Sequence, residues 1–88
     1  MLKTIPDFWY WDYRHREVRF CAWQNSEVVM CRISRKAIED RYGDASSPRS
    51  YVQVARQHVN EICNRVGGLL TQGRYENDGS VLLRPTDW

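Results

Sequence analysis

The sequence predicts a small α+β domain in the order β-β-α-α-β, with a three-stranded, mostly antiparallel sheet and two helices packed on one face. Three patterns indicate it: two apolar-rich strand segments over 16–33 with a turn between, an amphipathic stretch over 48–72, and an apolar run at 81–83. The 88 residues predict one domain over 1–88, because two domains of half that length would each lack a core.

The first fifteen residues are rich in aromatic side chains. Five of them fall between Phe8 and Tyr13. They follow neither the helical period of 3.6 nor the strand period of 2, and Pro6 interrupts any helix from the start. We therefore expect residues 1–15 to form an extended, aromatic-rich N-terminal arm that packs onto another surface.

A β-hairpin is predicted from the next two segments. Residues 16–23 alternate apolar and polar side chains, Asn25-Ser26 suits a two-residue turn, and residues 27–33 are then the return strand. This turn pairs Trp23 with Val28 and Phe20 with Cys31. One face of the hairpin then carries only apolar side chains: Val18, Phe20, Ala22, Val29, Cys31 and Ile33.

The opposite face of the hairpin is apolar next to the turn. It carries Glu17, Arg19, Cys21, Trp23, Val28, Met30 and Arg32. A solvated face is expected to be polar, so we expect either the aromatic arm or a second subunit to cover it. The same register places Cys21 and Cys31 on opposite faces of the sheet, which argues against a disulfide between them.

Two helices are predicted after the hairpin. Ser34 suits an N-cap for a short helix that ends at Gly43, and Ser47-Pro48 suits the start of a second helix. Apolar residues share one side of this second helix as far as Gln72. Its length of about 36 Å is as great as the width of a compact domain whose radius of gyration is about 12 Å. The helix must therefore overhang, bend at Gly67-Gly68 or pack against a partner.

The third strand follows a turn near the end of the chain. Asn77-Asp78-Gly79-Ser80 is a strong turn signal, and residues 81–84 are apolar enough for a buried strand. Pro85 ends this strand, and the last three residues are expected to form a short tail.

Composition excludes several classes of protein. Thirteen basic and eleven acidic residues give a net charge of +2, without the strong basic bias typical of phosphate-driven nucleic-acid binding. No apolar run approaches the roughly 18 residues of a membrane span. The start lacks the apolar stretch of a signal peptide, so a cytoplasmic protein is expected.

The sequence contains no recognisable catalytic motif. Three cysteines without CxxC spacing form neither a disulfide framework nor a zinc signature, and HExxH is absent. Gly67-Gly68 lacks the flanking residues of a phosphate-binding loop. We therefore expect a protein that is not an enzyme, with no catalytic residues, no metal and no cofactor.

Two functional hypotheses remain. The first is a protein-interaction module, an adaptor or regulator that contacts another protein or a second copy of itself. The alternative is weak binding of single-stranded nucleic acid, in which aromatic rings stack on bases and arginines contact phosphates. Interspersed acidic residues at Asp7, Asp12 and Glu17 weaken that alternative. The candidate binding residues are Trp9, Trp11, Arg14, Arg19, Trp23 and Met30.

Short segments spread over nearly the whole chain follow a recognisable succession: Ile5-Pro6, Tyr10-Trp11-Asp12, Val18-Arg19-Phe20, Cys31-Arg32-Ile33-Ser34, Ala37-Ile38-Glu39-Asp40-Arg41-Tyr42-Gly43, Asp78-Gly79-Ser80-Val81-Leu82-Leu83-Arg84 and Asp87-Trp88. In these segments the chain resembles the bacterial family catalogued as domain of unknown function 1488. The resemblance implies a short, single-domain bacterial protein and no known activity. The aromatic density near the start departs from the family pattern.

Overall fold

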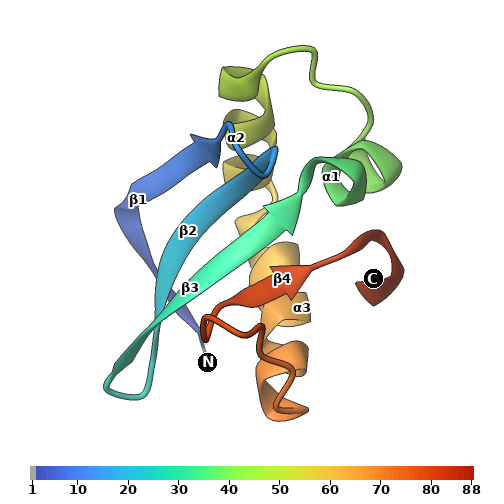
Figure 1. Ribbon diagram of the computed structural model, residues 1–88. Helices are drawn as coiled ribbons and strands as arrows, with labels where there is room; N and C mark the ends of the chain where they lie inside the picture. Colours follow the sequence, from blue (N-terminus) through green and yellow to red (C-terminus); the bar gives the residue numbers. More distant parts are fainter. Residues whose placement is uncertain (1) are drawn as a thin grey trace.

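The computed structural model describes residues 2–88. Over this range it has a four-stranded sheet in the order β1-β2-β3-β4 and three α-helices (Figure 1). The elements are β1 (Lys3–Asp12), β2 (Glu17–Gln24), β3 (Glu27–Ser34), α1 (Arg35–Tyr42), α2 (Pro48–Gln57), α3 (Val59–Thr71), β4 (Val81–Leu83) and the 3-10 helix η1 (Pro85–Asp87). The predicted α+β class is confirmed. The predicted three strands and two helices are wrong, because each number is one too few.

The additional strand is β1, which lies within the predicted N-terminal arm. It pairs antiparallel with β2, with Thr4 opposite Ala22 and Trp9 opposite Phe20, and its register shifts between these pairs. Pro6 lies in the shifted segment and has no N–H to donate, which suits an edge strand. The strand period was hidden because the four consecutive residues from Phe8 to Trp11 are all aromatic and point to both faces of the sheet, so no polar residue marks the alternation there.

The β2–β3 hairpin has the predicted register. Trp23 lies opposite Val28 and Phe20 opposite Cys31. Asn25 adopts a positive φ of 58°, as the predicted turn requires. All three cysteines are free, in agreement with the expectation for Cys21 and Cys31.

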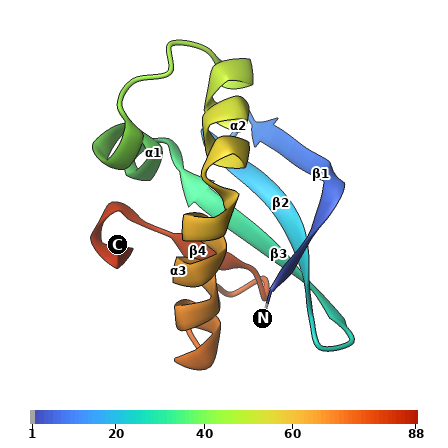
Figure 2. The same ribbon diagram turned by 180° about the vertical axis from the view of Figure 1, so that it is seen from behind.

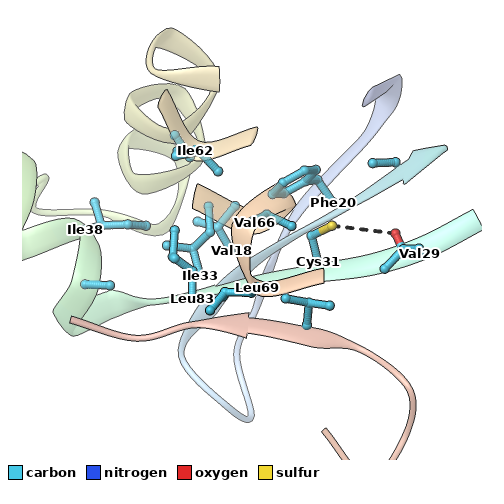
Figure 3. Packing of buried hydrophobic residues seen from close by; sticks show 14 of the residues in the cluster. Val18, Phe20, Val29, Cys31, Ile33, Ile38, Ile62, Val66, Leu69 and Leu83 are labelled. Carbon is cyan, nitrogen blue, oxygen red and sulfur yellow. Dashed lines mark hydrogen bonds between the residues drawn. The ribbon is translucent and has the colours of Figure 1, made fainter. Parts of the chain in front are cut away.

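The hydrophobic core lies between the sheet and the helices (Figure 3). The predicted apolar face of the hairpin is buried, and Trp9 of β1 stacks on Phe20 with ring centroids 4.2 Å apart. The buried side chains of this cluster are Val18, Phe20, Ala22, Val29, Cys31, Ile33, Ala37, Ile38, Tyr51, Ala55, Ile62, Val66, Leu69, Leu70, Val81 and Leu83.

The predicted long helix is broken at His58 into α2 and α3, as Figure 2 shows from the helix side. His58 leaves the helical conformation with φ of −109° and ψ of 27°, and its ring stacks on Tyr42 of α1 at 3.9 Å. The prediction of one helix over 48–72 is wrong, and a bend at Gly67-Gly68, one of its three expected alternatives, does not occur because both glycines lie inside a continuous α3. The break lets α2 pack on β1 and β2 while α3 packs on β4. The radius of gyration, 11.9 Å, agrees with the expected value.

Capping residues fix the ends of the first two helices as predicted. The Ser34 hydroxyl accepts a hydrogen bond from the Ala37 amide at 3.0 Å, and Gly43 ends α1 with φ of 94°. Ser47 accepts from the Ser50 amide at 3.2 Å, ahead of Pro48 at the first position of α2.

The C-terminal segment completes the sheet. β4 pairs parallel with β3, with Cys31 opposite Val81, so the sheet is mixed. The expected tail is the short helix η1, which packs against α1, and Trp88 meets Tyr42 edge to face at 5.7 Å. None of the helices in the described part of the chain is long and apolar enough to cross a membrane.

Candidate functional site

One face of the sheet, termed the outer face, points away from the helices and toward the viewer in Figure 1. Its apolar half, termed the outer patch, consists of Phe8, Tyr10, Trp23, Val28 and Met30. Four of these side chains are 46%, 40%, 43% and 52% exposed, in the order Phe8, Tyr10, Trp23, Val28. Met30 is half-buried. The outer patch is therefore a surface of large apolar groups in contact with solvent.

The predicted cover for this face is not provided by the N-terminal arm. Residues 3–12 extend the sheet sideways at the edge of β2 instead of folding over it. β1 thus adds Phe8 and Tyr10 to the outer patch, where the two rings meet edge to face at 6.3 Å. The arm enlarges the apolar surface that it was expected to hide.

The other half of the outer face is a compact ion cluster around Glu17. Glu17 is only 2% exposed, and Arg32 donates two hydrogen bonds to its carboxylate, at 2.9 and 3.0 Å. Arg19 adds an ion pair to Glu17 at 3.1 Å and another to Asp12 at 3.0 Å. A buried carboxylate is stable only when it is paired and hydrogen-bonded, so these contacts explain how a charge can lie in the sheet surface. Their opposite charges leave the region nearly neutral.

Asp12, His15 and Glu17 bring possible metal-ligating atoms within 4.8 Å of one another. The carboxylate of Glu17 is already occupied by two arginines. That of Asp12 accepts hydrogen bonds from the amides of Arg14 and His15. A cation would have to displace these donors and would meet the charge of Arg19 nearby, so the cluster is better suited to holding the β1–β2 turn than to binding a metal.

A second feature lies at the opposite surface, where the β1–β2 turn approaches the start of α2. Two hollows meet along a ridge formed by Trp11, Tyr13 and Pro48, and we term the whole the β1–α2 groove. One hollow, of about 480 Å³, is also lined by Arg16 and Arg35. The second, of about 570 Å³, is lined by Arg49, Val52, Gln53 and Arg56 of α2. Both volumes lie within the range of small-molecule pockets.

The acidic groups near the groove are engaged within the protein. Tyr51 forms the floor of the first hollow, and its hydroxyl donates toward Glu39 at 3.1 Å and Asp44 at 3.0 Å. Hydrogen bonds from the Ser46 amide and Tyr51 lower the pKa of Asp44, whose carboxylate is therefore firmly ionised. Glu39 also pairs with Arg35 at 3.3 Å.

The arginines of the groove are less engaged. Within residues 2–88, no carboxylate lies within 4 Å of the guanidinium groups of Arg16, Arg49 or Arg56. Arg35 differs from these three, because its Nε atom is ion-paired with Glu39 Oε1 at 3.3 Å. The groove therefore combines aromatic surface with cationic groups that have unused hydrogen-bond donors.

The six residues predicted as a binding set do not form one site. Trp9 and Trp11 lie on the inner face, where Trp11 stacks on Tyr51 at 5.1 Å. Trp23 and Met30 belong to the outer patch, and Arg19 belongs to the ion cluster. The last of the six, Arg14, is exposed in the β1–β2 turn.

The α2 residues of the groove escaped the sequence analysis for a physical reason. Arg49 and Arg56 are seven positions apart, which puts them on one side of α2, two turns apart. That spacing was the only available signal, and it is also typical of an ordinary solvated helix face. Nothing local indicates that Tyr13 lies beside them, because their proximity arises from the packing of α2 on β1.

The cysteines offer little nucleophilic character. Burial raises the pKa of the Cys31 thiol to about 12, and its Sγ atom points toward the Val29 carbonyl at 3.7 Å (Figure 3). Burial also raises the pKa values of Cys21 and Cys63. Because the thiolate is the reactive form, all three cysteines are predominantly protonated and weakly nucleophilic at neutral pH.

Fold and surface together define a small single-sheet α+β domain, with helices on one face and exposed aromatic groups on the other. The chain belongs to the family described as "Protein of unknown function (DUF1488)", whose model matches residues 6–83. A crystal structure of a protein of unknown function from this family, from Shewanella loihica PV-4, has a TM-score of 0.83 at 18% identity. That likeness covers 93% of this chain and 90% of the other, and at this identity it shows the shared fold alone.

No curated protein matches the chain. The family match confirms the resemblance seen in the sequence. Because neither comparison assigns an activity, function has to be argued from the surface of this molecule.

Proposed function

We propose that the protein is a non-enzymatic interaction module that binds an apolar surface of another protein through the outer patch. The observation that carries the proposal is the exposure of Phe8, Tyr10, Trp23 and Val28 on a sheet face that no helix covers. Contiguous exposed apolar surface on a small monomer is typical of interaction sites. Aromatic side chains are also enriched at the centres of protein interfaces.

The size of the outer patch favours a transient heterologous partner over a permanent dimer. With roughly 150–250 Å² for each aromatic side chain, the exposed fractions correspond to a patch on the order of 400 Å². A stable complex usually buries about 800 Å² on each partner. The patch thus supplies the centre of an interface, and a larger partner surface would extend over its polar surroundings.

The ion cluster beside the outer patch supports the same proposal. Its carboxylates and guanidinium groups are paired within the sheet, so they form a polar border with little net charge. Interfaces commonly have an apolar centre and a polar border that sets orientation. The partner is therefore proposed to present an apolar, uncharged surface to Trp23 and Val28.

The alternative, nucleic-acid binding by the cluster predicted from the sequence, receives less support in its original form. Arg19 is held by Glu17, and Trp23 lies on the face of the sheet opposite Trp11. Stacking and phosphate contacts cannot combine on residues that are separated by the sheet. A ligand of that chemistry fits a different set of arginines, which we consider in the next subsection.

Site-specific photo-crosslinking in cells tests the proposed partner. A photoreactive phenylalanine analogue placed at Trp23 or Val28 should give a discrete adduct with one other protein. The same analogue at Tyr75 is the matched control, because Tyr75 is 51% exposed but lies in the α3–β4 loop. No adduct from the outer patch, or equal adducts from all three positions, would overturn the proposal.

Repeating the reaction with purified protein distinguishes a homodimer from a complex with another protein. Two results would assign the outer patch to self-association and overturn the heterologous partner: an adduct with a second copy, and a particle mass in solution that doubles as the protein concentration rises. Persistence of a monomer in this experiment, together with the cellular adduct, supports the proposal.

A further inference from the structure

We propose that the β1–α2 groove binds a short segment of single-stranded nucleic acid, with bases on its aromatic ridge and phosphates at its arginines. The groove and the outer patch share no residues, so a test of nucleic-acid binding does not depend on whether the outer patch binds a protein. The proposal rests on an exposed aromatic ridge that is shared by two hollows, each of which is lined by two arginines.

The ridge presents a free ring to solvent. Tyr13 is 78% exposed and lies between the two hollows with Trp11, whose own ring is supported from below by Tyr51 at 5.1 Å. The exposed ring of Tyr13 offers a face on which a base can stack, and such stacking tolerates any base sequence. Pro48 closes the ridge on the side of α2.

Charge complementarity selects an anionic ligand. Arg16 and Arg35 border one hollow, and Arg49 and Arg56 border the other. Asp44 also lines the first hollow, and Glu39 pairs with Arg35, so the first hollow carries less positive charge. The second hollow has two arginines and no acidic residue among its lining, so it supplies most of the attraction for phosphate. Arginine donates in a planar fork that matches phosphate oxygens and also stacks on rings, so it serves both parts of a nucleotide.

The framework around the first hollow is rigid. The Arg35 amide donates to the Arg16 carbonyl at 3.1 Å, which ties the β1–β2 turn to the start of α1. The Arg35 guanidinium lies over the Tyr51 ring, with Cζ 5.8 Å from its centroid. Its Nε atom is ion-paired with Glu39 Oε1 at 3.3 Å. Arg16 has no carboxylate within 4 Å of its guanidinium among residues 2–88, so Arg16 is the group of this hollow that is free to contact a phosphate.

The arrangement of the two hollows favours a strand over a single nucleotide. They share Trp11, Tyr13 and Pro48 as a common wall and carry separate pairs of arginines. One ring with phosphates on both sides is the repeat of a polynucleotide backbone, whereas a mononucleotide has phosphate on one side only. We therefore expect affinity to rise when the ligand spans both hollows.

Fluorescence anisotropy with a labelled ten-residue oligothymidylate tests the proposal at low and high salt. The wild-type protein should give saturable binding that weakens as salt rises, because phosphate contacts release counterions. Tyr13→Ser should weaken binding by about tenfold, in line with the loss of one stacked base. The Arg49→Gln/Arg56→Gln double variant should weaken it further and reduce the salt dependence.

Arg65→Gln is the matched control, because Arg65 is exposed on α3 and lines neither hollow. All substituted side chains are exposed, so circular dichroism should show unchanged folding. No saturable binding at low salt would overturn the proposal. So would a loss from Arg65→Gln equal to that of the double variant, since that would indicate general charge attraction.

Competitors distinguish the chemistry of the ligand. Unlabelled oligothymidylate should displace the probe at lower concentrations than thymidine monophosphate or inorganic polyphosphate. Displacement by polyphosphate at the same phosphate concentration would show that the ring contributes nothing and overturn the stacking model. Equal displacement by polyglutamate would assign the groove to acidic protein and likewise contradict the proposal.

Discussion

The two faces of the sheet are both rich in aromatic residues but have opposite surroundings. Along β1, Trp9 stacks on Phe20 inside the core, while Phe8 and Tyr10 on the same strand remain exposed. What separates the faces is the position of the helices, since α2 and α3 cover only the inner one (Figures 1 and 2). Apolar composition therefore shows where burial would be favourable, and the position of the helix layer decides which face of the sheet is buried.

The largest contrast between the faces is expected for two residues of β2. Phe20→Ala removes a fully buried ring and should lower the free energy of unfolding by about 3–5 kcal/mol. Trp23→Ala removes a half-exposed ring on the outer face and should cost below about 1 kcal/mol. Urea denaturation of both variants measures the difference.

Phe20→Leu serves as the companion variant if Phe20→Ala does not fold. It should retain the fold with a smaller loss, because most of the core volume is kept. A loss from Trp23→Ala as large as that from the Phe20 variants would show that the outer face is covered in solution, and the contrast between the faces would fail.

The second prediction concerns the single buried charge cluster of the outer face. Glu17→Gln removes the charge that both Arg19 and Arg32 contact, and should destabilise the fold by about 3 kcal/mol, because Arg32 loses its carboxylate partner and Arg19 keeps only Asp12. Glu27→Gln is the control, because Glu27 is exposed in the same hairpin. Thermal denaturation compares them. Similar melting temperatures for the two variants would mean that the cluster adds nothing to stability.

The smallest effect is expected in the helix layer, where a more exposed ion pair joins α1 to α3. Glu61 accepts hydrogen bonds from Arg41, at 2.8 Å, and from the Tyr42 hydroxyl, and these bonds lower the pKa of Glu61 to about 2. Its folded pKa lies below the ordinary value of 4.5, so its contribution is complete above pH 4.5 and is lost as the pH falls toward 2.

Melting temperatures between pH 6 and pH 2 check this dependence. Glu61→Gln should lose the part of the acid sensitivity that Glu61 supplies. Because Glu61 is partly exposed, added salt should weaken its effect, whereas the buried Glu17 cluster should respond less to salt. An unchanged acid profile in Glu61→Gln would contradict the assignment of the low pKa to this contact.

Local chemistry made much of the fold predictable. The Asn25-Ser26 turn set the hairpin register, and Ser34, Gly43 and Ser47 marked helix ends that the structure contains. These signals act over a few residues, so they can be read from the chain directly. The register also placed Cys21 and Cys31 correctly on opposite faces.

Features that depend on contacts between distant segments were missed. The break at His58 coincides with a stack on Tyr42, sixteen positions earlier, and no helix-breaking residue marks it. β1 was missed because its aromatic residues alternate between two apolar faces. The apolar character of the outer face was anticipated from the residue types, but cover by the N-terminal arm was wrong, and the β1–α2 groove needed the packing of α2 beside Tyr13.

The register shift in β1 has a consequence for how the molecule behaves in a crowded cell. The free backbone of an edge strand can recruit further strands and start fibre growth. Here Pro6 lacks a donor, the pairing of β1 with β2 is irregular from Thr4 to Trp9, and the exposed Lys3 and Asp7 carry charge. The molecule can thus expose apolar side chains on its outer face while its strand edge resists polymerisation, so the proposed binding through the outer patch would not bring strand-to-strand aggregation with it.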